Sequence, residues 1–168
     1  MKIQPKPSIV PLPAPRFLPR RTRTKLLPLE PCVTNSHAFH LNLLKIAYNN
    51  LTQQADFKDD QVESVNIEFL NQFASLVEAY EQHQPGAYDQ GQDVLVRMVR
   101  SYPQYVHLVA RDLFWLFGGE CLHFMSDEEI GQFQQLDEAL SEAEAQQHEV
   151  DYLQLRQAVL DPGSDTRH

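Results

Sequence analysis

The chain has 168 residues, a net charge of −9 and 42% apolar residues, which predicts one globular domain with a hydrophobic core. No uncharged apolar run approaches the ~20 residues that cross a bilayer, so we expect no membrane span. The basic N-terminus has no apolar stretch, so we also expect no secretory signal. Two cysteines, Cys32 and Cys121, make no disulfide framework and favour a cytoplasmic location.

The first 29 residues differ in charge from the rest of the chain. They hold seven Lys or Arg and no acid, whereas all 23 acids follow, with seven bases, which gives +7 against −16. Seven of the eleven prolines also lie there, and prolines at this density exclude a helix. We predict an extended or disordered basic arm over residues 1–31. A helical domain over 32–160 and a loose tail over 161–168 follow.

Three helices are predicted in the first part of the domain. Capping residues and helical spacing of leucines predict the first over 36–54. A long apolar stripe that includes Phe69 and Phe73 predicts the second over 59–83. The segment 90–101 has the β-branched residues typical of a strand, but it lacks a partner strand, so we favour a helix there.

The second half of the domain predicts two or three more helices. Pro103 suits the first turn of a helix that ends at Phe117, with Gly118 as its cap. A capping box at Ser126 predicts one long helix, or two in succession, over about 127–160. The fold class is therefore all-α, a bundle of five or six helices preceded by the basic arm.

The stretch from Arg111 to Glu129 is the first place to look for catalysis. Cys121 and His123 would serve as thiolate and base, but neighbours two residues apart point away from each other in a helix. Acidic neighbours also suppress a thiolate. We predict no catalytic residue and favour a protein that is not an enzyme.

A metal site is the alternative use of these residues. The candidate ligands, which have zinc-like chemistry but match no standard zinc spacing, are Cys32, His37, His40, Cys121 and His123. Glu120 and His123 form only half of a di-iron motif. The plainer interpretation has no cofactor, with His40 facing solvent and Cys121 as a small buried hydrophobic residue.

Aromatic residues are unusually dense at the end of the helix predicted to finish at Phe117. Phe114, Trp115 and Phe117 are interpreted as part of a buried cluster. Because they widen the apolar stripe beyond what a small bundle covers, we predict that some lie in an interface of a homo-oligomer.

The leading functional hypothesis is a non-enzymatic helical adaptor or regulatory protein that acts through protein–protein contacts. The arm would supply Arg16, Phe17, Arg20, Arg21, Arg23 and Lys25, and the acidic helix that begins after Ser126 would supply Glu128, Glu138, Glu142, Glu144 and Glu149. The alternatives are a small metal-dependent enzyme or zinc-stabilised module, and nucleic-acid binding through the arm. The acidic domain disfavours nucleic acid because its carboxylates repel phosphate.

Overall fold

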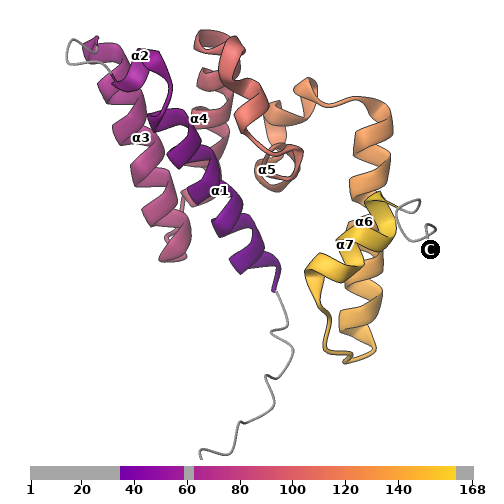
Figure 1. Cartoon of the computed structure of the whole chain (residues 1–168). Coiled ribbons are helices and arrows are strands. Elements are labelled where there is room, and N and C mark those ends of the chain that lie inside the picture. Colours follow the sequence, from indigo (N-terminus) through magenta and orange to yellow (C-terminus); the bar gives the residue numbers. More distant parts are fainter. Residues whose placement is uncertain (1–34, 59–62, 162–168) are drawn as a thin grey trace, which may run out of the picture. The chain divides into compact units, whose positions relative to one another are not determined.

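The structure is a computed structural model that describes residues 35–58 and 63–161 (Figure 1). All regular structure in these two ranges is helical, so the predicted all-α fold is confirmed. The helices, with η marking 3₁₀ segments, are α1 (Ser36–Thr52), α2 (Ala55–Lys58), α3 (Ser64–Glu81), α4 (Ala87–Ser101), η1 (Pro103–Leu108), α5 (Arg111–Phe117), η2 (Gly119–Phe124), α6 (Asp127–Ala145) and α7 (Tyr152–Leu160).

Three helices form the centre of the bundle. Helix α3 packs against both α1 and α4, and Figure 1 shows α1 in indigo and α3 in magenta. Helix α5 contacts both α1 and α4, while α6 and α7 pack against each other. Helix α7 also contacts α1, and α6 contacts α5, so the last two helices are joined to the rest of the bundle.

The core is built from large apolar side chains of several helices. Among the most completely buried are Leu44, Leu51, Phe69, Phe73, Leu76, Leu95, Met98, Leu113, Phe114 and Leu136. The rings of Phe69 and Phe73 lie 6.3 Å apart in a T-shaped contact, a favourable geometry for aromatic pairs. Burying side chains of this size stabilises the fold by roughly 2–3 kcal/mol each.

The first two predicted helices have shorter bounds in the structure. The helix predicted over 36–54 ends at Thr52 and is followed by the four-residue helix α2, which the sequence did not predict. Asn35 is the N-cap of α1, and its side chain accepts a hydrogen bond from the Ala38 N–H at 2.7 Å. The helix predicted over 59–83 begins at Ser64, while residues 59–62 lie outside the described ranges.

Helices α3 and α6 both end without glycine. His83 and Gln147 take left-handed conformations, with φ values of 53° and 55°. After α3, the His83 N–H donates to Tyr80 and the Gln84 N–H donates to Ala79, at 3.2 and 2.9 Å. This pair of backbone hydrogen bonds defines a Schellman motif, which usually has glycine at the left-handed position. The end of α3 therefore lay two residues before the predicted one.

The prediction of a single helix that runs to Phe117 is wrong. Residues 103–108 form the 3₁₀ segment η1, and α5 begins only at Arg111. The predicted cap at Gly118 is present: its φ of 59° and ψ of −147° suit glycine and end α5. The 3₁₀ segment η2 then leads to Ser126.

The region predicted over 127–160 contains two helices, which was one of the two arrangements expected. The predicted capping box is confirmed, with Ser126 and Glu129 bonding each other's backbone N–H groups. Among the described helices none is long and apolar enough to cross a membrane. The predicted arm and residues 162–168 of the predicted tail lie outside the described ranges.

Candidate functional site

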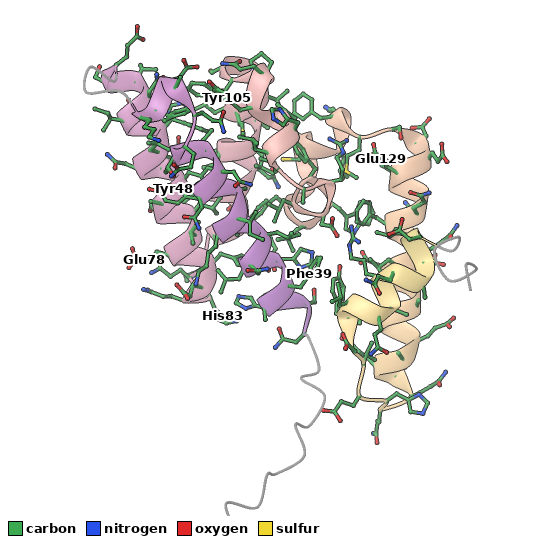
Figure 2. All side chains as sticks on the ribbon, viewed as in Figure 1. Phe39, Tyr48, Glu78, His83, Tyr105 and Glu129 are labelled. Atoms are coloured by element: carbon green, nitrogen blue, oxygen red, sulfur yellow. The ribbon has the colours of Figure 1, made fainter. Side chains whose placement is uncertain are left out.

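A buried ion pair holds the last helix against the bundle. Arg156 of α7 donates from Nε and from one terminal nitrogen to the two carboxylate oxygens of Asp112 in α5, at 2.5 and 2.8 Å. The Asp112 side chain is 3% exposed and that of Arg156 is 23% exposed. The Arg156 guanidinium also lies 5.6 Å from the ring centroid of Phe39, which Figure 2 shows on the side of α1 that faces α7.

His40 and Tyr152 lie next to this ion pair, and both are uncharged at neutral pH. Nδ1 of His40 donates to the Ser36 carbonyl oxygen at 2.7 Å, and burial lowers the pKa of the ring. Burial likewise raises the pKa of the Tyr152 hydroxyl to about 12. The two ring centroids lie 5.4 Å apart. Both residues therefore act as neutral polar surfaces rather than as charges.

These two residues form part of the wall of a cleft of about 400 Å³, a size that is typical of ligand pockets. The cleft is lined by Ser36, His40, Tyr88, Trp115, Leu116, Leu122, Asp137, Leu140 and Tyr152. Among its described lining residues there is no lysine or arginine, and Asp137 is the one acidic side chain. The cleft is thus aromatic and aliphatic with a single negative charge.

Trp115 and Asp137 are fixed with respect to each other. The indole N–H of Trp115 donates to one carboxylate oxygen of Asp137 at 3.1 Å. The indole ring also stacks on Phe133, with centroids 5.8 Å apart and planes 15° from parallel. Trp115 is half-buried while Phe133 is buried in the core, so the core side chain holds the indole in place.

The surface of α6 next to this cleft is strongly acidic. Its exposed acids are Asp127, Glu128, Asp137, Glu138, Glu142 and Glu144. No lysine or arginine occurs between Arg111 and Arg156, so none of the side chains in this stretch neutralises them. Glu138 and Glu142 are four residues apart, a spacing at which like charges destabilise a helix by about 0.2–0.5 kcal/mol. We refer to these exposed acids as the α6 acidic face.

Only the start of α6 has a described cationic partner. Arg111 donates from two nitrogens to the two carboxylate oxygens of Glu129, at 2.7 and 3.1 Å. This pairing and the capping hydrogen bonds from Ser126 lower the pKa of Glu129 to about 2. Figure 2 labels Glu129 in the first turn of α6.

We expect Glu129→Gln to lower the free energy of unfolding by about 1 kcal/mol at pH 7, since both side chains are about a third exposed. Glutamine keeps the capping geometry, so the change removes mainly the charge. A carboxyl whose pKa is lowered by folding stabilises above its unfolded pKa of about 4.5 and loses this effect as the pH falls toward 2. The difference between wild type and variant in chemical denaturation should therefore shrink from pH 5 to about pH 2. A difference that is constant over this range would contradict the assignment.

A second aromatic group lies where the start of α1 meets the end of α3. The ring of His37 is stacked on Tyr80 at 4.6 Å and on His83 at 3.9 Å between centroids, and its Nε2 donates to the Tyr80 carbonyl at 3.0 Å. Figure 2 labels His83 at this end of α3. The stack supports the left-handed backbone of His83, so we assign it a structural role.

The candidate metal ligands that the structure describes are not brought together as a site. His37 is in the stack just described, Cys121 is buried, and His123 is exposed. In the described part of the chain no three His, Cys, Asp or Glu side chains are placed to hold a metal ion, and Cys32 lies outside it. The expectation that His40 faces solvent is wrong, because its side chain is packed between α1 and α7 and is 4% exposed.

Cys121 is confirmed as a small buried hydrophobic residue. It is fully buried in η2, and burial followed by the charge of Glu120 raises the pKa of its thiol to about 11. The thiol is therefore protonated at neutral pH. This protonation state does not suit a nucleophile.

The predicted interaction residues divide into three groups. Arg16, Phe17, Arg20, Arg21 and Arg23 lie outside the described residues. Phe114 and Phe117 are buried in the core, and Trp115 is half-buried at the cleft. The bundle thus covers the rings of Phe114 and Phe117 within one chain. The large exposed apolar side chains of the described ranges are Ile46, Val65, Ile67, Tyr88 and Leu153.

Sequence reasoning missed Asp112, Arg156, Asp137 and Tyr152. Two signals for the ion pair were present: Asp112 interrupts an apolar helix, and Arg156 is the one base between Arg111 and Arg167. The cleft itself had no such signal. Its residues come from six helical segments, and only the packing of these segments brings them together.

Comparison with known proteins identifies one relationship. No curated protein and no solved structure matches the chain. The family model described as PA2817-like matches residues 32–168, a range that includes every described helix and every residue of the cleft. The chain belongs to the PA2817-like family.

Proposed function

We propose that this protein is a non-enzymatic adaptor or regulatory protein, and that its α6 acidic face binds basic segments of proteins. The observation that carries the proposal is the unneutralised charge of this face. Selection for stability alone would not favour neighbouring like charges such as Glu138 and Glu142. Their repulsion is relieved when a basic segment binds.

The first ligand that we propose is the chain's own basic segment, residues 1–29, in the same molecule or in a second copy. Its charge of +7 is opposite in sign to that of the face. Binding to a second copy would link subunits, which is how the protein would form a homo-oligomer. In either case one ligand could be exchanged for another, which is the basis of the regulatory role.

Charge alone is too weak to hold such a segment. Exposed ion pairs contribute only about 0–1 kcal/mol each, and salt screens them. The apolar residues of the segment, such as Phe17, Leu18 and Leu26, would supply further stabilisation, while the charges set orientation and association rate.

Limited trypsin digestion of the full chain tests the binding of its own segment. We expect cleavage between Arg20 and Lys25 to be about threefold or more slower at about 20 mM salt than at about 500 mM salt, because bound segments resist proteolysis and salt weakens binding. A free peptide of residues 14–29 digested in parallel corrects for the effect of salt on trypsin. The variant Glu142→Lys, which changes the proposed binding face, should lose most of the protection. The control variant Glu78→Lys on α3 (Figure 2) should keep it. Equal corrected rates at both salt concentrations would overturn the proposed binding.

A further inference from the structure

The cleft beside the α6 acidic face combines an aromatic ring with a carboxylate, and this chain uses the same combination elsewhere to hold arginine side chains. Three arginines each combine an aromatic ring with a carboxylate. Arg97 lies 5.5 Å from the Phe69 centroid and pairs with Glu68. Arg111 lies 4.9 Å from the Phe114 centroid and pairs with Glu129.

The third example is the buried one. Arg156 lies over the ring of Phe39 and forms two hydrogen bonds to Asp112. The planar guanidinium suits both partners at once, because its edge donates to a carboxylate while its face lies against a ring.

Trp115 and Asp137 form a fourth pair of an aromatic ring and a carboxylate, and no described arginine contacts them. One oxygen of Asp137 accepts the indole N–H, and its other oxygen has no hydrogen bond within the described residues. Both side chains line the cleft, together with the rings of Tyr88 and Tyr152. Tryptophan is the most favourable aromatic partner for a cation.

The rest of the cleft suits a long side chain with a charged end. Leu116, Leu122 and Leu140 provide an apolar surface for a methylene stem. No cation in the wall opposes a positive ligand, since His40 is neutral. Asp137 belongs both to the cleft and to the α6 acidic face, so a segment bound along α6 passes the opening of the cleft.

We infer that this cleft binds the guanidinium side chain of one arginine in the basic segment that α6 recognises. The inference rests on the proposed function and specifies how that surface selects its ligand. The carboxylate of Asp137 accepts from the guanidinium edge, and the rings of Trp115 and Tyr152 contact its faces. An arginine is preferred to a lysine because an ammonium group cannot present an edge and a face to two partners at once.

Trp115 is the one tryptophan of the chain, so its fluorescence reports on the cleft directly. The host is the full chain with Arg16→Gln, Arg20→Gln, Arg21→Gln and Arg23→Gln, so that its own arginines do not compete. The two ligands are a peptide of residues 14–29 and the same peptide with its four arginines replaced by lysine, which keeps the net charge. We expect the arginine peptide to change the Trp115 emission saturably and to bind about tenfold or more tightly than the lysine peptide.

Two matched variants separate the cleft from general charge attraction. Asp137→Asn keeps an acceptor for the indole N–H and should remove most of the preference for arginine. Glu138→Gln removes the same charge from the next residue of α6 and should leave the preference intact. Circular dichroism checks that both variants are folded, and the comparison of the two peptides on the unsubstituted cleft needs neither variant.

The possible failures are distinguishable. If both peptides bind equally well and the two variants have equal effects, the acidic face binds basic segments without the cleft, and the inference is wrong while the proposed function stands. If neither peptide binds, the proposed function fails and the inference fails with it.

Discussion

Replacing Arg156 with alanine is expected to lower the free energy of unfolding by about 3–5 kcal/mol, because Asp112 would remain buried without its partner. The Asp112 side chain is 3% exposed, so water cannot replace the guanidinium without opening the packing of α5 and α7. The loss of contact with Phe39 adds to the effect. Chemical denaturation followed by circular dichroism measures the change.

Two controls show whether the buried charge is the cause. Arg100→Ala removes an ion pair with Glu120 in which both side chains are at least 65% exposed, and should cost less than about 1 kcal/mol. The double variant Asp112→Leu with Arg156→Met removes both charges and should recover much of the lost stability. An Arg156→Ala variant that is as stable as Arg100→Ala would contradict the role of the ion pair.

The second large effect is expected for Gly91→Ala in α4. A methyl group built on Gly91 would overlap the ring carbons of Phe117, which is 3% exposed and therefore has little space to move into. Overpacking of this kind costs about 1–3 kcal/mol or more, which outweighs the gain of about 0.5–1 kcal/mol from replacing a helical glycine. We expect a net loss of stability by thermal and chemical denaturation.

Gly131→Ala in α6 is the matched control. An added methyl group there meets no atom within 4 Å, so this variant should gain about 0.5–1 kcal/mol from its helical propensity. If Gly91→Ala were stabilising to the same extent, the close contact between α4 and the ring of Phe117 would be refuted.

The all-α fold followed from the sequence because helical spacing and caps agree in most segments. The capping box at Ser126 and the glycine cap at Gly118 were both predicted correctly from residue type. The ends of α3 and α6 were harder to place, since His83 and Gln147 occupy left-handed positions where glycine is expected. His83 is supported there by its stack on His37, a contact between distant residues that no local pattern reveals.

The candidate site was less predictable for the same reason. The negative charge of α6 is visible in the sequence, as is the positive charge of residues 1–29. The burial of His40 and the contact between Trp115 and Asp137 depend on how α1, α5 and α6 pack. Sequence spacing describes one helix at a time, whereas the cleft is formed by side chains from several.

The binding of the peptide of residues 14–29 to the full chain with its four arm arginines replaced by glutamine tests the central claim most directly. Fluorescence anisotropy at about 20 mM and about 500 mM salt gives the dissociation constant in each condition. We predict that the affinity weakens about tenfold or more at high salt. At low salt, Glu142→Lys should weaken binding about tenfold, whereas Glu78→Lys, with the same change in net charge, should have a small effect. Equal effects of Glu142→Lys and Glu78→Lys, or an affinity that does not depend on salt, would contradict the account that the α6 acidic face is the binding surface.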